Sequence, residues 1–373
     1  MAASTFLFWL SLYFYVPFLP LRAQDLGASN TMLGAVVASY AIAQVGLRIP
    51  IGIGADAIGR RKPFAVAALV ASALGALGLA LSPNPWSLFA ARAVTGIAGA
   101  GWVAITVLYA SYFAAGDAAK AMSRIMAVNA LALVLATFIG GVVADQFGTT
   151  STFTLGVVVG AAGAVLMLLA DEPPLADRRG YSARAFLEVA RVPLLVSVSV
   201  IGITVQFVSF ATSFGFVPVY AEQVGASDAE VGYVTTVMFA TSVLGTLVTP
   251  WLVARTGYGM TLALGIVVTA LGAVLVPATS DVIGLAATQV LNGLGRGSTN
   301  ALLITLAVLA VAPAQRATAM GVYQAVYAIG MLSGPVVAGA VADTAGIDAV
   351  FYLSTVVGLL GAVLLLMRPL PRA

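Results

Sequence analysis

Residues 18–34 read FLPLRAQDLGASNTMLG, and residues 216–232, found 198 positions later, read FVPVYAEQVGASDAEVG. The two stretches share a Phe, a Pro, the run Gly-Ala-Ser and a closing Gly at the same spacing, and the same offset carries Asp145 onto Asp343. Pairs of Pro, Ser, Phe and Asp in one register are much harder to obtain by chance than pairs of Ala or Val. The repeat predicts two membrane-embedded halves that face each other across a central cavity.

The composition places the chain in lipid. Of its 373 residues, 61% are hydrophobic and only 8% are charged, and the mean hydropathy is +1.05, whereas soluble domains carry roughly 25% charged residues. Most of its apolar stretches are about 20 residues long, which is enough to cross the bilayer core as helices, and they lack the alternation of barrel strands. The sequence predicts an all-α membrane protein with 12 transmembrane helices in two pseudo-symmetric six-helix bundles. The apolar stretches are residues 4–21, 31–53, 63–82, 86–112, 123–144, 151–170, 194–219, 229–253, 259–278, 282–311, 317–342 and 348–367.

The longest polar interruption, Asp171 to Arg191, divides the chain. It contains two consecutive prolines and charges of both signs, which end a helix and keep the segment at the membrane surface. We predict an N-terminal six-helix bundle at residues 1–170, a cytoplasmic linker at 171–192 and a C-terminal six-helix bundle at 193–373. The other loops are short, so neighbouring helices are expected to run antiparallel.

Several classes of function are excluded by what the chain lacks. It contains neither His nor Cys, which excludes imidazole and thiolate metal ligands, cysteine nucleophiles and disulfides. Its acids all fall outside the predicted helix cores, so an intramembrane enzyme would have no buried acid or base. No phosphate-binding glycine loop is present, which argues against ATP as direct fuel. We predict no enzyme activity, no cofactor and no metal.

The positive charges predict the orientation. With the N-terminus in the cytoplasm, thirteen of the 17 Lys and Arg residues lie inside, only Arg22 lies outside, and Arg48, Arg92 and Arg296 fall within helices. The positive-inside rule favours this arrangement over its reverse. We predict a multi-pass protein of the cytoplasmic (inner) membrane with both termini cytoplasmic. The basic residues are spread over many short loops without interleaved aromatics, so no nucleic-acid partner is predicted.

The loop between the second and third predicted helices, residues 52–62, reads GIGADAIGRRK. Its glycines permit a tight turn, and Asp56 places a carboxylate where a helix N-terminus or an arginine could bind it. The basic residues of this loop are expected beside Asp117, at the cytoplasmic end of the same half. The alternative is that the charges only anchor the topology, which we favour for Arg61 and Lys62. The predicted conformational latch comprises Gly52, Asp56, Gly59, Arg60, Arg61 and Asp117.

This loop closely resembles the signature of the major facilitator superfamily, Gly-x-Leu-Ala-Asp-Arg-x-Gly-Arg-Lys. Residues 92–96, Arg-Ala-Val-Thr-Gly, are similar to the Arg-x-x-x-Gly element of the family. Residues 330–339 look like the Gly-Pro element that antiporters of the family carry on helix five, although here it lies on the eleventh helix, and Ala136-Thr137 stand at the equivalent place on helix five. The resemblance covers the whole chain. It implies two six-helix bundles, alternating access and secondary transport, with a leaning toward multidrug-type export.

A polar stripe on the tenth predicted helix indicates the path of the cargo. Gln289, Asn292, Arg296 and Asn300 are spaced 3, 4 and 4 apart and share one face. An arginine at a helix centre costs about 2.5–3.5 kcal/mol on insertion scales, so it normally faces an aqueous cavity or a partner. We favour a cavity over interhelical hydrogen bonding. Glycines 293, 295 and 297 would let another helix approach. Arg48 is interpreted as extending to the cytoplasmic surface.

The predicted cargo-binding residues are Arg296, Asn292, Asn300, Gln289, Arg92, Tyr13, Asn129, Gln206, Tyr323, Gln324 and Tyr327. Buried arginines without a buried carboxylate favour an anionic or amphipathic cargo. The predicted function is a monomeric secondary active or facilitative transporter of a small organic molecule, with export favoured and the coupling ion left open. The alternatives are an uptake carrier for an organic anion or a sugar-like metabolite and, from another class, a transport-dead membrane scaffold or receptor.

Overall fold

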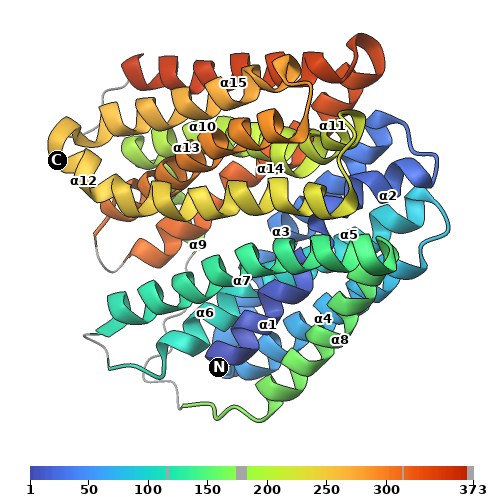
Figure 1. Cartoon of the computed structure of the whole chain (residues 1–373). Coiled ribbons are helices and arrows are strands. Elements are labelled where there is room, and N and C mark those ends of the chain that lie inside the picture. The colour runs from blue at the N-terminus through green and yellow to red at the C-terminus, as the bar shows by residue number, and fades with distance from the viewer. Residues whose placement is uncertain (115–116, 174–182, 313–314, 368–373) are drawn as a thin grey trace.

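The structure is a computed structural model that describes residues 1–114, 117–173, 183–312 and 315–367. In these ranges the chain forms helices and turns and no strand, which confirms the predicted all-α class. Figure 1 shows the helices of the first half mainly in the lower part of the molecule and those of the second half in the upper part.

The described residues of the first half form eight α-helices. They are α1 (Ala2–Tyr13), α2 (Leu19–Asp25), α3 (Asn30–Ile58), α4 (Lys62–Leu81), α5 (Pro85–Ala100), α6 (Trp102–Ala110), α7 (Ala118–Phe147) and α8 (Thr150–Leu168). A 3-10 turn, Val16–Phe18, separates α1 from α2, and Pro17 and Pro20 lie at this break. Prolines suit the first turn of a helix because their missing N–H has no partner there.

The helices of the second half are α9 (Ala183–Ala190), α10 (Pro193–Ala211), α11 (Val217–Gln223), α12 (Asp228–Val274), α13 (Val282–Leu309), α14 (Arg316–Ala345) and α15 (Ile347–Met367). They follow the same path as those of the first half, with an extra helix at the start and with α12 and α13 each continuous where the first half has two helices. A π-helical turn, Thr212–Phe216, joins α10 to α11, and a 3-10 turn, Val276–Ala278, follows α12. Helix α9 lies in the predicted linker 171–192, of which residues 174–182 fall outside the described part. The proposed bundle boundaries therefore remain a prediction.

The backbone carries the repeat that the sequence predicts. Six glycines in the described residues have positive φ: Gly27, Gly59, Gly148, Gly225, Gly257 and Gly346. They form three pairs at the offset of 198 residues, with φ of 80° and 83°, 71° and 78°, and 82° and 85°. Residues with a Cβ rarely adopt this region, so a glycine is favoured at each of these turns. The two halves thus turn at equivalent places.

Ten helical segments among the described residues are long and apolar enough to cross a membrane. One of them, Asp228–Ala278, has 51 residues, and at about 1.5 Å per residue it is more than twice as long as the roughly 30 Å bilayer core requires. Within it Gly257 has non-helical backbone angles, φ 78° and ψ 170°, and separates one limb of α12 from the other. Helix α13 is not among the ten. The number of twelve spans remains a prediction.

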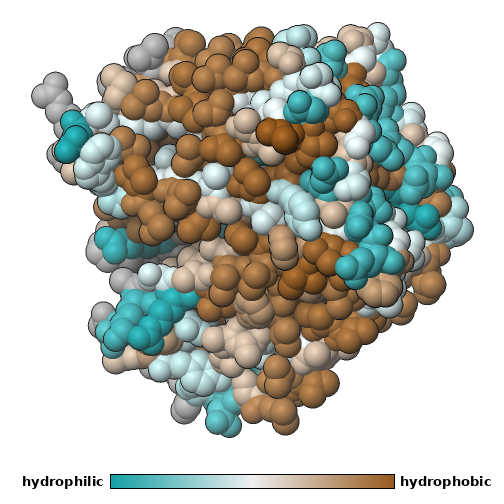
Figure 2. All heavy atoms as spheres, viewed as in Figure 1, coloured by the Kyte–Doolittle hydropathy of each residue, from teal (hydrophilic) through white to brown (hydrophobic). Residues whose placement is uncertain are grey.

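The surface in Figure 2 suits a protein surrounded by lipid. Hydrophobic side chains cover the middle of this face, and hydrophilic ones gather toward its left and right ends. Large apolar side chains are exposed along many of the helices, among them Leu74, Val158, Leu247, Trp251 and Val356. An exposed apolar surface of this extent would aggregate in water, whereas in a bilayer it faces lipid.

Two equivalent helix crossings join the halves. Helix α3 packs on α14, and α7 packs on α12. A Cβ on Gly34 would lie 2.0 Å from the carbonyl oxygen of Pro335, and a Cβ on Gly232 would lie 2.5 Å from the Cα of Gly141. Only glycine permits such close approach. The repeated glycines Gly34 and Gly232 therefore have the same task in the two crossings.

The hydrophobic core is continuous between the halves at one end only. The largest cluster contains Leu33 and Tyr40 of the first half together with Phe210, Phe216 and Val231 of the second. We call this end, formed by residues 18–34 and 216–232, the clasp end. Toward the opposite end each half has its own core, one around Phe8 and Ile105 and one around Leu303 and Tyr323.

At the end opposite the clasp end the halves are separated by a cavity of about 500 Å³. Helix α7 contributes Met122 and Met126, α13 contributes Ile304 and Leu309, and α14 contributes Arg316. Both methionines and both of these α13 side chains are exposed. The structure therefore captures a form that is joined at the clasp end and open at the other end.

Candidate functional site

Three glycines fix how α13 is rotated. A Cβ on Gly293 would lie 2.0 Å from Thr241 Oγ1, and one on Gly297 would lie 2.0 Å from the Ser242 carbonyl oxygen, both on the first limb of α12. A Cβ on Gly295 would lie 2.2 Å from Thr269 Oγ1 on the second limb. Helix α13 is therefore wedged between the two limbs, which confirms the predicted close approach. This wedge determines where its polar stripe points.

The stripe divides into a buried part and a partly accessible part. Gln289 and Asn292 are each 1% exposed. Asn292 Nδ2 donates to Ser213 Oγ at 3.1 Å and to Gln289 Oε1 at 3.3 Å. Asn292 therefore holds α13 to the π turn, and Gln289 bonds to Asn292 within α13. Interhelical hydrogen bonding, the alternative that we did not favour, describes Asn292 better. Arg296 and Asn300 are half-buried, and only they keep the accessibility that a cargo contact requires.

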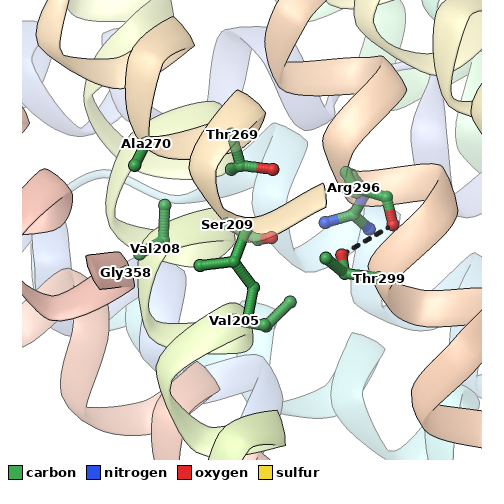
Figure 3. Close-up of a pocket in the computed structure, with 9 residues that line it drawn as sticks. Val205, Val208, Ser209, Thr269, Ala270, Arg296, Thr299 and Gly358 are labelled. Atoms are coloured by element: carbon green, nitrogen blue, oxygen red, sulfur yellow. Dashed lines mark hydrogen bonds between the residues drawn. The ribbon is translucent and has the colours of Figure 1, made fainter. Parts of the chain in front are cut away.

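Arg296 lies against an aromatic side chain and has spare hydrogen-bonding capacity. Its Cζ lies 5.1 Å from the centroid of the Phe214 ring, a distance at which a cation is attracted to an aromatic face. Its Nη1 is buried and has no hydrogen-bond partner among the described residues. Figure 3 shows Arg296 and Thr299 side by side on α13, facing Ser209 and Val205 of α10. The cavity there, about 10 Å³, is the size of a single water.

An aromatic cluster brings the first half to Arg296. Tyr13 of α1 lies 5.6 Å from Phe239 of α12 and 6.4 Å from Phe214 of the π turn, measured between ring centroids. Trp9, one turn before Tyr13, lies 5.7 Å from it. We call Trp9, Tyr13, Phe214 and Phe239 the aromatic wall. The structure thus joins the predicted residues Tyr13 and Arg296 through two phenylalanines that were not predicted.

Arg48 bonds across the interface between the halves. Its Nη1 donates to Gln324 Oε1 at 3.0 Å and to Tyr327 OH at 3.4 Å, both on α14, and its Nη2 donates to Gln44 Oε1 on its own helix. Tyr327 in turn packs edge-on against Tyr323 at 5.0 Å. Three predicted residues, Gln324, Tyr327 and Tyr323, are therefore gathered together. The interpretation of Arg48 as extending to the membrane surface is wrong, because acceptors on α14 hold its guanidinium.

In the described part of the chain, the other predicted cargo contacts form no hydrogen bond or ring contact with these groups. Arg92 is 6% exposed, and its Cζ lies 4.5 Å from the Tyr40 ring centroid, inside the first half. Its Nη1 donates to Thr95 Oγ1 at 3.3 Å. Gln206 on α10 is half-buried, and its Oε1 has no partner among the described residues. Asn129 is half-buried on α7.

The predicted latch loop meets a different acid from the one expected. The Glu172 carboxylate accepts from the backbone N–H of Lys62 at 2.9 Å, from that of Arg61 and from Arg60 Nε at 3.5 Å. Partial burial opposes ionisation of Glu172, but the N–H groups of Lys62 and Arg61 and the Arg60 guanidinium outweigh it, so its pKa is below the ordinary value.

The remaining latch residues add little to this contact. Gly59 makes the turn with φ 71°, and Gly52 is half-buried on α3. Asp117 is exposed at the start of α7. The Asp56 side chain lies outside the described residues. The expected partnership of the basic residues with Asp117 is therefore replaced by one with Glu172, which lies shortly after the end of α8.

The sequence model of the Major Facilitator Superfamily matches residues 1–224 and 199–373. The chain is 23% identical to an "Uncharacterized MFS-type transporter" of Methanocaldococcus jannaschii, covering 98% of this chain and 96% of the relative. It is 26% identical to the "Multi-drug resistance efflux pump PmrA" of Streptococcus pneumoniae, covering 94% and 90%. Among solved structures, the nucleoside transporter NupG superposes with a TM-score of 0.76 at 18% identity, covering 99% of this chain and 99% of that one.

Proposed function

The chain belongs to the Major Facilitator Superfamily, and from this premise we propose that it is a secondary transporter of a small organic anion with an apolar, aromatic-compatible body. The observation that carries the anion is Arg296, a half-buried guanidinium at mid-helix whose Nη1 is buried without a partner among the described residues. A buried cation of this kind is stabilised by an anion that completes its hydrogen bonds.

The aromatic wall gives the cargo its second property. Phe214 and Phe239 are buried, and Tyr13 is half-buried. Binding sites for small molecules are mostly apolar, with few polar groups that fix orientation. In this proposal the wall binds the body of the cargo, Arg296 binds its acidic group, and Asn300 on the same face orients it.

Transport by alternating access requires a molecule that opens at one end at a time. The shared core at the clasp end and the separate cores at the other end are one such state. We propose export as the direction, supported by the similarity to an efflux pump. We also propose a monomer in the cytoplasmic membrane with both termini cytoplasmic.

The first test is a binding screen followed by flux. Purified wild-type protein is heated with panels of organic anions, cations and neutral metabolites, and compounds that raise its melting temperature are then tested for uptake into liposomes containing the protein. We expect organic anions with an apolar body to stabilise the protein and to cross the membrane. Stabilisation only by cations or neutral compounds would contradict the proposed cargo class, and binding without flux would contradict transport.

Variants of Arg296 test whether this residue binds the anion found in the screen. Truncating a charged contact in a desolvated site costs about 2–5 kcal/mol, more than tenfold in affinity, so Arg296→Ala should lose the anion. Arg296→Lys should keep part of the affinity, because the charge remains while the planar fork is lost. Arg255→Ala is the matched control, since Arg255 is exposed and stacks on Trp251 at 4.1 Å. Equal affinity in Arg296→Ala and Arg255→Ala would contradict the role of Arg296.

A further inference from the structure

Arg48 is a cation within a predicted membrane span whose visible partners are all neutral. Its guanidinium donates to the side-chain oxygens of Gln44, Gln324 and Tyr327, and its Nε is buried without a partner among the described residues. The one ion pair found in the described part of the chain joins Arg60 to Glu172. Neutral acceptors satisfy the hydrogen bonds of a guanidinium but leave its charge uncompensated at a depth where charge is costly.

The space beside Arg48 lies between the halves. A cavity of about 10 Å³, enough for one water, is lined by Gln44 and Arg48 of α3 and by Gly321, Gln324 and Ala328 of α14. A Cβ on Gly321 would have no heavy atom within 4 Å, so α14 leaves room next to the guanidinium. The site is small in this state, and it would widen when α3 and α14 separate.

Tyr327 connects this space to Arg296. Its hydroxyl accepts from Arg48, and its ring packs, like that of Tyr13, against the core cluster that contains Phe214 and Phe239. Arg48 belongs to α3 in the first half, and Arg296 belongs to α13 in the second. Two guanidiniums, one from each half, therefore lie against the same core, Arg48 at Tyr327 and Arg296 at Phe214, and each has a buried nitrogen without a partner among the described residues.

We propose that Arg48 is a second anion-binding residue of the cargo site, so that the cargo is a dianion with one acidic group bound by Arg48 and the other by Arg296. This inference rests on the proposed function. The first acidic group displaces Gln324 and Tyr327 from Arg48, because a carboxylate forms stronger, charge-assisted hydrogen bonds than an amide or a phenol. The direct hydrogen bonds between Arg48 and α14 are then replaced by a bridge from Arg48 through the cargo to Arg296. Cargo binding is thereby coupled to the relative movement of the halves.

The test compares ligands that differ in one charge. Benzoate, phthalate and terephthalate share a ring and carry one carboxylate or two at different spacings. Their dissociation constants are measured by isothermal titration on the purified full-length protein. We expect at least one dicarboxylate to bind the wild type about tenfold or more tightly than benzoate, the usual effect of one added buried charge contact. Equal binding of all three, or no saturable binding of any, would overturn the proposal.

Two variants should change the preference in opposite directions. Arg48→Met removes the charge and should abolish the dicarboxylate advantage, so that the dicarboxylates bind this variant no more tightly than benzoate does. Gln324→Met removes a competing acceptor and should keep or increase dicarboxylate affinity, by about two- to tenfold for one neutral hydrogen bond. If Arg48 and Gln324 only tied the helices together, both variants would weaken binding alike, and that outcome would overturn the assignment.

A third variant covers the case in which Arg48→Met does not fold. Arg48→Lys retains the charge and should retain part of the dicarboxylate advantage, together with its dependence on ionic strength. An advantage in this variant as large as in the wild type but insensitive to salt would overturn the proposal. Benzoate binding that is lost in Arg296→Ala, with no dicarboxylate advantage in the wild type, would leave the proposed function standing and remove only the role of Arg48.

Discussion

Close packing at three glycines of α13 decides where Arg296 points. Gly297 packs directly on the Ser242 carbonyl, and Gly293 and Gly295 pack on threonine hydroxyls of the two limbs of α12. Helix α13 can rotate little without driving backbone into backbone. The arginine that we propose to bind cargo is therefore positioned by residues that never touch the cargo, which is how a site inside a helical bundle acquires a fixed geometry.

Gly297→Ala tests this positioning at the scale of one methyl group. Its Cβ would lie 2.0 Å from the Ser242 carbonyl oxygen, so α13 must shift, and overpacking of this kind costs about 1–3 kcal/mol. We expect a lower melting temperature and weaker anion binding. Gly46→Ala is the matched control, because a Cβ there meets no atom within 4 Å and Ala favours a helix interior over Gly by about 0.5–1 kcal/mol. Equal melting temperatures for the two variants would contradict the packing argument.

At this scale, the spacing of residues predicted which side chains share a helix face but not which residues they contact. The one-face stripe and the three glycines followed from helical periodicity, since residues three or four apart share a face. Periodicity does not show which of those polar residues meets protein, so Asn292 could not be distinguished from Arg296. Phe214 and Phe239 are two of 17 phenylalanines, and no local pattern separates them. Glu172 meets Lys62 across 110 positions of chain, which only tertiary structure reveals.

At the scale of helices, the repeat is symmetric in backbone and asymmetric in chemistry. Asp343 at the end of α14 accepts from the backbone N–H of Asn30 at 3.0 Å, from that of Thr31 at 2.9 Å and from Thr31 Oγ1 at 2.7 Å. These donors lie at the N-terminus of α3, where a negative charge is stabilised. At the offset of 198 residues, Asp145 corresponds to Asp343, and Asp228 and Ala229 correspond to Asn30 and Thr31, so the equivalent position offers a like charge and no hydroxyl.

Asp343→Ala should therefore loosen the α3–α14 crossing and shift the equilibrium toward opening at the clasp end. The chain has no native cysteine, so Ala338→Cys, at a buried position on α14, reports that opening by its rate of maleimide labelling. We expect several-fold faster labelling when Asp343→Ala is added. Asp145→Ala is the control and should leave the rate unchanged, because Asp145 lacks those donors. Equal acceleration by both variants would show that charge alone, rather than the hydrogen bonds at α3, holds this end.

The sequence also predicted much at the element scale, because element boundaries depend on local residues. The offset of 198 residues located all three pairs of positive-φ glycines in the described structure. The stretches 229–253 and 259–278 were predicted as separate helices, and the non-helical backbone of Gly257 divides α12 into two limbs between them. The π turn at Thr212–Phe216 had no signal in the sequence, since its geometry follows from packing against neighbouring helices.

At the scale of the whole molecule, charge and shape give complementary information. The structure has a joined clasp end and an open end, but a bundle of helices does not by itself report which end faces the cytoplasm. The basic residues supply that missing direction. The loops at the open end include Arg60, Arg61, Lys62 and Lys120, whereas the clasp stretches 18–34 and 216–232 contain a single basic residue, Arg22. The positive-inside rule predicts that the open end is cytoplasmic. In that orientation this form would receive cargo from inside the cell, as the proposed export requires.

Single cysteines in the otherwise cysteine-free chain test this orientation. Gln223 is exposed at the end of α11 on the clasp side, and Asp117 is exposed at the start of α7 on the open side. Gln223→Cys should react with a membrane-impermeant maleimide added to intact cells, and Asp117→Cys should react only after the membrane is permeabilised. Lys and Arg in short loops set the orientation of a membrane protein because they resist translocation. Thirteen of these residues are predicted inside and one outside, so few positive charges favour the reverse orientation. Labelling of Asp117→Cys but not Gln223→Cys in intact cells would show that the orientation is the reverse of the predicted one. The captured form would then open to the outside, as expected of an uptake carrier before it binds cargo.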